Sequence, residues 1–169
     1  MNRTRAELVG AAARAFAAQG LRRSTMASIA AEAGVAKGTL YNYFRTKDDV
    51  AWALLVAETE RLIGLAGDRP RADALAALAD ELATHPVLRR LAEDEPGRLT
   101  LDPDRWAGAT GRLADVLDLD EDGAELTARW LLGLVLQPGR TTARRRQAEL
   151  LAAALAPGAR PVSAAAGPA

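Results

Sequence analysis

The stretch TMASIAAEAGVAKGTLYNYF, residues 25–44, decides the fold because it holds two short helical patterns on either side of one glycine. Ser24 or Thr25 offers the cap of the first helix. Its apolar residues are spaced as on one face of a helix, at Met26, Ile29, Ala30 and Ala33. Ala30 is small enough for two helices to cross closely, and Gly34 can take the positive φ that a tight turn needs. Because a second helical stretch resumes over 35–44, the spacing predicts a helix-turn-helix unit.

The second of these helices has one apolar face and one polar face. Counted at about 100° per residue from Leu40, Ala36 and Phe44 lie within about 40° of it, whereas Gly38 and Asn42 point about 160° away. We therefore expect Leu40 to anchor the helix and the opposite side to face solvent. That polar side and its flanks offer groups that reach base edges and phosphate oxygens in a major groove, among them Lys37, Thr39 and Tyr41.

The composition of the 169 residues favours an all-helical protein. Hydrophobic residues make up 49% and aromatic residues only 4%, so alanine and leucine supply most of the packing, and alanine is the strongest helix former. The 22 basic and 22 acidic residues balance, which argues against a histone-like protein and an acidic disordered activator. Residues 1–47 nevertheless carry a net charge of +6 and the remainder −6, which suggests that the N-terminal part meets phosphate.

The rest of the chain shows helix signals separated by proline and glycine. Thr4 and Glu7 form a capping-box pattern before the first helix, which Gly20 ends. Thr46 is placed to cap a longer helix that reaches about Ile63. Further helices are expected to begin at Pro70, at Asp102 and Pro103, at 120–122 and at Thr141 or Thr142. The helix that begins at 120–122 is expected to bury Leu126, Trp130, Leu131, Leu134 and Val135.

The run from Thr25 to Val50, preceded by a helix with Phe16 near its end and Gly20 after it, closely resembles the DNA-binding domain of the TetR family of transcriptional regulators. The resemblance covers residues 4–55. It implies an all-α fold with a three-helix DNA-binding head over 1–46 and a helical ligand-binding and dimerisation body over 47–156. Residues 157–169 are rich in alanine, proline and glycine and are expected to be a disordered tail.

The resemblance also implies which side chains meet double-stranded DNA. The positions that would lie at the groove are Lys37, Gly38, Thr39, Tyr41 and Asn42. Tyr43 would donate its hydroxyl to a phosphate, and Lys47 would pair with another. Thr25 and Ser28 begin a helix, where an anion is favoured, and would contact backbone phosphates.

The body offers candidates for an effector pocket and a dimer interface. Trp52, Trp106 and Trp130 follow apolar stripes, for which core packing is the ordinary role, and Trp106 and Trp130 are also candidates to line an effector pocket. The last two helices would form the homodimer interface through Leu131, Leu134, Leu151 and Leu155. The run Arg144 to Arg146 is interpreted as a surface or dimer-edge cluster.

Several kinds of chemistry find no support in the sequence. The chain has no cysteine, and its single histidine, His85, precedes Pro86 at an expected helix end, where capping is the favoured role. Asp118, Asp120 and Asp122 imitate the start of a calcium-binding EF-hand loop, but the twelfth position is Arg129 instead of the required glutamate. We therefore expect no enzyme activity, no metal and no cofactor.

Two functional interpretations remain from the sequence. The first is a ligand-released homodimeric repressor that binds a palindromic operator and an unknown small-molecule effector. The alternative is a helical dimeric binding or scaffold protein that keeps the head without regulating transcription. With no apolar stretch of about 18 residues and no leader pattern, we expect a cytoplasmic protein without a membrane partner.

Overall fold

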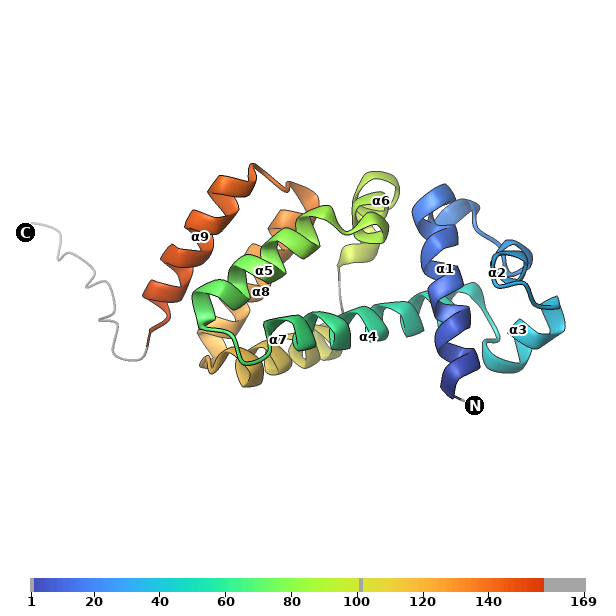
Figure 1. Ribbon diagram of the computed structural model, residues 1–169, viewed down its shortest axis with the longest axis horizontal. Coiled ribbons are helices and arrows are strands. Elements are labelled where there is room, and N and C mark those ends of the chain that lie inside the picture. Colours follow the sequence, from blue (N-terminus) through green and yellow to red (C-terminus); the bar gives the residue numbers. More distant parts are fainter. Residues whose placement is uncertain (1, 101, 157–169) are drawn as a thin grey trace, which may run out of the picture.

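The computed structural model describes residues 2–100 and 102–156, and every regular element within those ranges is a helix (Figure 1). The elements are α1 (Asn2–Arg23), α2 (Met26–Glu32), α3 (Lys37–Tyr43), α4 (Lys47–Ala66), α5 (Arg71–Thr84), α6 (Pro86–Asp94), the 3₁₀ helix η1 (Pro96–Leu99), α7 (Pro103–Leu117), α8 (Glu121–Leu136) and α9 (Thr141–Ala154). The expected all-α fold is confirmed. The expected tail at 157–169 lies outside the described residues.

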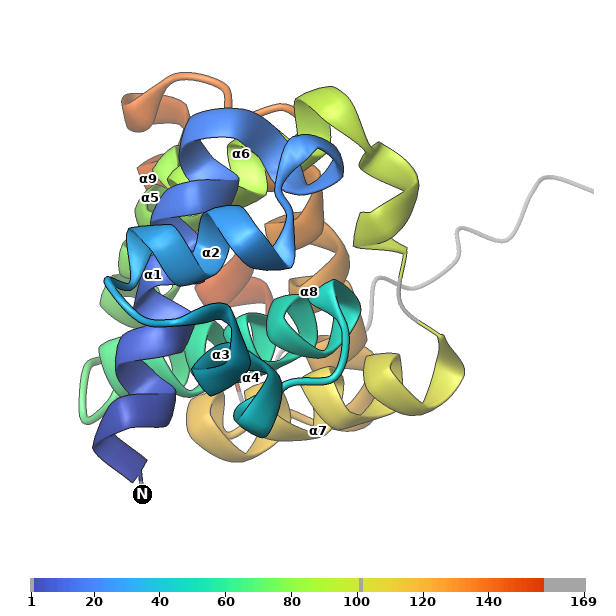
Figure 2. The same cartoon turned by 90° about the vertical axis from the view of Figure 1, so that its right-hand side faces the viewer.

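The helices form two groups joined by α4. Helices α1, α2 and α3 lie together at one end of an elongated molecule, and we call them the head (Figure 1). Helix α4 runs from beneath the head into the second group, where α5, α7, α8 and α9 gather; α4 to α9 are called the body. Viewed onto the head end, α2 and α3 lie in front of the body, at the surface (Figure 2). One continuous helix therefore connects both parts.

Side-chain caps set the starts of several helices. Thr46 accepts a hydrogen bond from the backbone N of Asp49 (3.0 Å), and its own N donates to the Asp49 carboxylate (2.9 Å), so the expected cap of α4 is a full capping box. Thr25 and Ser28 make the same reciprocal pair at the start of α2. Ser24, the other candidate cap, is instead buried and donates its hydroxyl to the carbonyl of Gly20 (2.8 Å).

Some helix ends differ from the expected ones by a few residues. α1 begins at Asn2, so Thr4 lies inside its first turn and not at its cap. Gly20 has the positive φ expected of a terminator (80°), but the chain makes one more helical turn to Arg23 beyond it. At the far end of α4 the helix continues past Ile63 to Ala66.

Two clusters of buried apolar side chains form the core. The first contains residues from α1, α2 and α3 together with Val50, Ala53 and Leu54 of α4 and Leu91 of α6. The second lies in the body and centres on α5, whose Leu75 and Ala79 are fully buried. Because the first turns of α4 belong to the head's cluster, the head and the start of α4 are packed as one unit.

The structure corrects two expectations about the last two helices. Leu126 was expected inside α8 but is 51% exposed, because it lies on the side of that helix that faces solvent. Arg144 was expected on the surface but is only 6% exposed. Its guanidinium donates to Asp80 Oδ1 (2.8 Å), to the carbonyls of Pro138 (3.0 Å) and Gly139 (3.2 Å) and to Thr141 Oγ1 (3.0 Å). This one side chain joins α5, the turn before α9 and the start of α9.

We predict that Arg144→Ala lowers the free energy of unfolding by about 2 kcal/mol, since hydrogen bonds to a charged group contribute about 1.5–3 kcal/mol and the two carbonyls lose their donor. The matched control is Arg146→Ala, which removes an exposed arginine two residues away and should change stability by less than about 0.5 kcal/mol. Urea unfolding followed by circular dichroism measures both. Equal losses in the two variants would contradict a structural role of Arg144.

Candidate functional site

The inner face of α3 is anchored by apolar contacts. Leu40 is 0% exposed and packs in the head's cluster with Ile29 and Ala30 of α2. Phe44, which directly follows α3, is buried in the same cluster. Gly34 supplies the turn with φ of 67°, and the next backbone N, that of Val35, donates to the carbonyl of Ala30 (3.0 Å). The predicted helix-turn-helix geometry is confirmed.

The outer face of α3 lies open to solvent. Lys37, Gly38, Tyr41 and Asn42 are exposed, and Thr39 is half-buried. A Cβ atom placed on Gly38 would meet no other atom within 4 Å, so a large object can approach the backbone there. The ammonium of Lys37 lies 5.6 Å from the centre of the Tyr41 ring, a cation–π contact that keeps both groups on the same side of the helix. The outer face of α3 is therefore polar and exposed, as expected.

Three of the residues expected to contact phosphates also form hydrogen bonds within the protein. Thr25 and Ser28 are held by each other in the capping box at the start of α2. The ammonium of Lys47 donates to the carbonyls of Leu21 (2.7 Å) and Arg22 (3.3 Å) at the end of α1. Of its three N–H groups, one is left for another partner. Sequence reasoning missed this link between α1 and α4, because 26 residues separate Lys47 from Leu21.

Tyr43 differs from its neighbours on α3. It is half-buried and packs against the apolar cluster of the head. Its ring therefore also contributes to packing, while the expected contact of its hydroxyl with a phosphate stays a prediction. Arg22, Arg23 and Arg45 are exposed and add to the positive charge of residues 1–47.

The body contains an apolar cavity of about 220 Å³, which we call the body cavity. It lies between α4, α5, α7 and α8, and its apolar lining includes Leu62, Leu78, Trp106, Leu113, Val116 and Leu131. Trp106 therefore occupies the place expected of a pocket residue. Trp130 does not line this cavity, because it lies on the side of α8 that faces α9, where its indole N–H donates to Gln147 Oε1 (3.2 Å).

A polar cluster borders the body cavity beside α6. Glu58 of α4 lines the cavity, and its carboxylate accepts from Arg61 Nε (2.7 Å) and from His85 Nε2 (3.1 Å). His85 Nδ1 accepts from the backbone N of Leu88 (3.3 Å), so the ring hydrogen resides on Nε2. Buried His85 thus caps α6, the helix that follows it, whereas the sequence suggested a role at the end of the preceding helix.

The ionisation of Glu58 depends on these neighbours. Burial of the carboxyl is the largest single influence and by itself favours the neutral acid, but the hydrogen bonds from Arg61 and His85, together with the positive charge of Arg61, outweigh it and hold the pKa of Glu58 below its ordinary value. The same pairing, opposed by partial burial, raises the pKa of Arg61. Glu58 is therefore a carboxylate at neutral pH.

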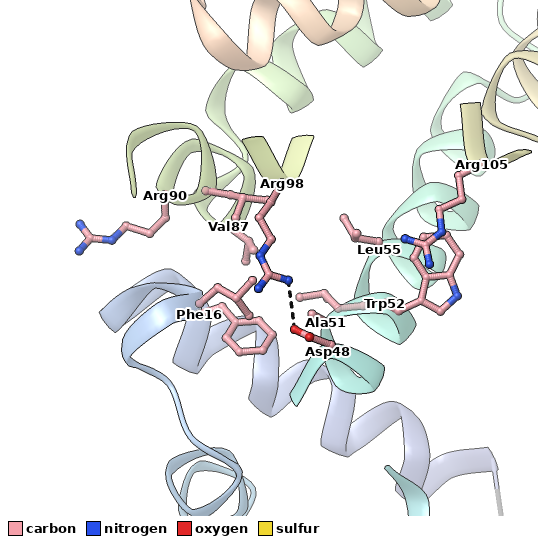
Figure 3. A pocket seen from close by; sticks show the side chains of 12 residues that line it. Phe16, Asp48, Ala51, Trp52, Leu55, Val87, Arg90, Arg98 and Arg105 are labelled. Carbon is pink, nitrogen blue, oxygen red and sulfur yellow. Dashed lines mark hydrogen bonds and ion pairs between the residues drawn. The ribbon is translucent and has the colours of Figure 1, made fainter. Parts of the chain in front are cut away.

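A second cavity, of about 320 Å³, lies where the head meets the body, and we call it the junction cavity (Figure 3). Phe16 of α1 and Trp52 of α4 line it, together with the three arginines Arg90, Arg98 and Arg105. Trp52 was expected in the core but is 39% exposed, because it borders this cavity. Sequence reasoning did not find the arginines, which lie on three different elements.

The expected dimer residues divide into two groups. Leu131 and Leu134 are buried in the body's own core and expose little surface to a second copy. Leu151 and Leu155 are half-buried and remain candidates. The helices instead expose Leu126 and Leu150, the latter at 61%, and the Trp130–Gln147 hydrogen bond joins the two helices beside them.

A short helix with one buried and one exposed face, joined by one continuous helix to a body that holds an apolar cavity, defines a helix-turn-helix protein with a helical body. Residues 8–54 match the family model described as bacterial regulatory proteins, tetR family. The match covers 47 of the 169 residues, so this segment of the chain is similar to the family. The matched segment contains the anchor Leu40 and the exposed residues of α3, so the predicted resemblance is confirmed.

Two curated transcriptional regulators are similar to a part of this chain. The HTH-type transcriptional regulator TtgR of Pseudomonas putida is 46% identical over 52 residues, which are 31% of this chain and 25% of TtgR. A second protein of Pseudomonas putida, the probable HTH-type transcriptional regulator ArpR, matches over the same length at the same identity. The chain thus aligns with only a quarter of the length of these curated relatives.

Solved structures extend the likeness to the whole fold. The TetR family repressor AlkX from Dietzia sp. strain DQ12-45-1b superposes with a TM-score of 0.66 at 18% identity, over 89% of this chain and 94% of AlkX. A TetR-family transcriptional regulator from Pectobacterium atrosepticum gives a TM-score of 0.65 at 23% identity, over 92% of this chain and 95% of that one. At these identities the likeness concerns the fold alone.

Two further observations concern the described part of the chain. Over residues 2–100 and 102–156, no helix is both long and apolar enough to cross a membrane. Within the same ranges no three histidine, aspartate or glutamate side chains come together as a metal site would require. The acidic residues near position 120 instead begin α8, where Asp120 caps the backbone N of Gly123 (2.8 Å).

We predict that the Glu58 cluster makes stability fall in acid. A carboxyl whose pKa is lower in the folded state stabilises the fold fully above its unfolded pKa, about 4.3, and this contribution is lost as the pH falls through the folded value. Glu58→Gln should lower the free energy of unfolding at pH 7 by about 1 kcal/mol and should flatten the decline below about pH 5. Urea unfolding at several pH values measures this.

The control for this experiment is Glu149→Gln, which changes an exposed carboxylate on α9 that pairs with Arg145. This variant should change the free energy of unfolding by less than about 0.5 kcal/mol. A Glu58→Gln protein as stable as the unsubstituted chain at pH 7, and declining as steeply in acid, would contradict the assigned role of the cluster.

Proposed function

We propose that this protein is a sequence-specific DNA-binding transcriptional regulator of the cytoplasm, a homodimeric repressor that a small-molecule effector releases from a palindromic operator. The observation that supports it most is the two-sided character of α3. Leu40 is fully buried, while Lys37, Gly38, Tyr41 and Asn42 on the other side are exposed and able to reach a major groove.

The residues of the head fall into two roles in this proposal. Asn42 and Thr39 read base edges, since an asparagine amide forms paired hydrogen bonds with adenine. Lys37 and Tyr41 flank the reading face, and Gly38 allows the groove wall to come close. Tyr43, Lys47, Thr25 and Ser28 contact phosphates, which fixes the position of the head on the duplex without reading sequence.

Dimerisation would place two heads on one duplex. A two-fold axis beside α8 and α9 presents two copies of α3 to successive major grooves, about 34–36 Å apart along the DNA. Leu126 and Leu150 supply exposed apolar surface on these two helices, and Leu151 and Leu155 lie beside it half-buried. When the apolar face of one protomer covers the same face of another, both are removed from water, which favours the dimer.

The effector in this proposal occupies the body cavity and acts through α4. This helix lines the body cavity with Leu55, Glu58 and Leu62, and it begins in the apolar cluster of the head with Val50 and Leu54. A ligand that binds better to one tilt of α4 shifts the population toward that tilt and changes the spacing of the two heads. The strength of the coupling between effector and DNA is then set by how much more tightly the effector binds one tilt of α4 than the other.

The first experiment is selection of bound sequences from random DNA, followed by a search for small molecules that release the complex. Enrichment of a palindromic sequence supports the proposal. A protein that enriches no sequence and does not shift its own upstream DNA in a gel would fit the scaffold alternative and contradict the regulator.

We predict that Asn42→Ala lowers affinity for the selected operator by about 1–3 kcal/mol and relaxes the preference at one base pair of each half-site. The physical reason is the loss of a paired hydrogen bond to one base edge. Fluorescence anisotropy with the operator, its single-base variants and an unrelated duplex measures the change. An equal loss on all these duplexes would count against base reading by Asn42.

Lys47→Ala is the contrasting variant for this measurement. It should weaken binding by a similar factor on the operator and on the unrelated duplex, and it should lower the slope of log affinity against log salt by about one unit. Because Lys47 also holds the carbonyls of Leu21 and Arg22, its melting temperature is measured alongside. An unchanged salt slope would contradict a contact between Lys47 and a phosphate.

We predict that the chain has twice its monomer mass in light scattering at micromolar concentration and that Leu150→Glu lowers this mass. A carboxylate at this position would have to be buried without a partner in the dimer. Leu136→Glu is the matched control, since Leu136 is also exposed on α8 (46%) but lies on the side near α7. A monomeric unsubstituted chain, or equal effects of the two substitutions, would refute this interface.

A further inference from the structure

The body cavity and the junction cavity meet at two side chains. Leu55 of α4 and Arg98 of η1 line both of them. The body cavity continues inward from these residues among leucines and Trp106, and the junction cavity opens outward between α1, α4, α6 and α7. A single ligand longer than either cavity can therefore pass Leu55 and occupy both.

The two cavities differ in polarity. Three arginines line the junction cavity, and each is paired with a carboxylate: Arg90 with Asp94, Arg98 with Asp48 and Glu95, and Arg105 with Asp102. The Arg98 guanidinium points into it toward Asp48 (Nη1 to Oδ1, 3.1 Å), and the Arg105 guanidinium lies 3.9 Å from the centre of the Trp52 ring (Figure 3). In the body cavity apolar side chains dominate. The combined space is thus apolar at its inner end, whereas its outer end is polar and presents the guanidinium groups of Arg98 and Arg105.

Arg98 pairs with two carboxylates, Asp48 and Glu95, and Asp48 is the one that a ligand can replace. The side chains of Arg98 and Asp48 are 47% and 66% exposed, and exposed ion pairs contribute little to stability. An incoming anion that replaces Asp48 keeps a charge-assisted hydrogen bond to Arg98. Its apolar chain, when it enters the body cavity, adds a hydrophobic gain that Asp48 does not offer.

We propose that the effector is an anionic amphiphile, with an apolar chain in the body cavity and an anionic head group on Arg98 in the junction cavity. The role as effector rests on the proposed function, whereas the binding itself does not. The Arg98–Asp48 pair connects η1 to the first turn of α4, and Asp48 lies four residues beyond Phe44, the residue that directly follows α3. When the ligand replaces Asp48, the ion pair between η1 and α4 is lost. The ligand itself then contacts the head at Phe16 and Leu21.

The test uses the full chain and probes that differ only in their head groups. Calorimetry measures the Kd of decanoate, decyl sulfate, decanol and decyltrimethylammonium, each below its critical micelle concentration. The two anions should bind about tenfold or more tightly than the alcohol, as charge-assisted hydrogen bonds imply, and the cation should bind more weakly still. Equal affinities for all four, or binding of none, would overturn the proposal.

Two substitutions with opposite expected effects make the test specific. Arg98→Gln should abolish the preference of the protein for the anions over decanol. Asp48→Asn should strengthen decanoate binding severalfold, because the competing carboxylate is gone, and a merely structural role of the pair does not predict this gain. Arg145→Gln, an exposed arginine on α9 that also pairs with carboxylates, is the control and should leave every Kd unchanged. Loss of decanoate binding in both Arg98→Gln and Asp48→Asn would contradict the exchange of partners.

The outcome can be separated from that of the proposed function. Operator binding is measured by anisotropy with and without decanoate, and ligand binding is measured without DNA. Decanoate binding with the stated variant pattern but without any operator binding supports the ligand site and contradicts the regulator. Operator binding in a chain that ignores all four probes supports the regulator and overturns the ligand site.

Discussion

The burial of Leu40 is the constraint on which the head depends. Helix α3 has seven residues and no side-chain cap at its start, and a helix so short is not stable on its own in water. Its conformation is therefore maintained by packing, with Leu40 inside α3 and Phe44 directly after it, both in the cluster with Ile29. Since all the anchoring contacts are on one edge, the opposite edge is free of them, and that is where Gly38 and Asn42 lie.

The first turn of α4 is the second point on which several parts converge. The capping box of Thr46 and Asp49 fixes where the helix starts, and Lys47 binds the end of α1. Asp48 reaches η1 in the body through Arg98. Val50, in the next turn, is fully buried in the head's cluster. A change in the direction of α4 therefore moves the head as one unit, and the hydrogen bonds at residues 46–49 transmit it.

The sequence predicted the head better than the body for a physical reason. In the head, each deciding residue acts over a short distance along the chain: Gly34 makes a turn, Thr46 bonds a residue three positions on, and Leu40 faces the preceding helix. Such local rules are visible in a sequence. Lys47 was the exception there, because its partners are 25 and 26 residues away.

In the body, most of the decisive contacts join distant segments. Leucine recurs on several sides of α8, so periodicity could not tell the buried Leu131 and Leu134 from the exposed Leu126. Three consecutive arginines look alike in the sequence, and only the position of Asp80, 64 residues earlier, makes Arg144 the buried one. The junction cavity draws on α1, α4, α6, η1 and α7 and leaves no local pattern at all.

The distribution of charge shows why a domain's net charge does not indicate the polarity of its cavities. Residues 48–169 sum to −6, which keeps the outside of the body unfavourable for DNA, so that the cationic head is the part drawn to phosphate. Yet Arg98 and Arg105 belong to the same residues and face the junction cavity. Each of these arginines has a carboxylate beside it, Asp48 and Glu95 at Arg98 and Asp102 at Arg105, so an anionic head group binds there by taking the place of a carboxylate. The same body can therefore repel a polyanion at its exterior and accept a single anionic group at the junction.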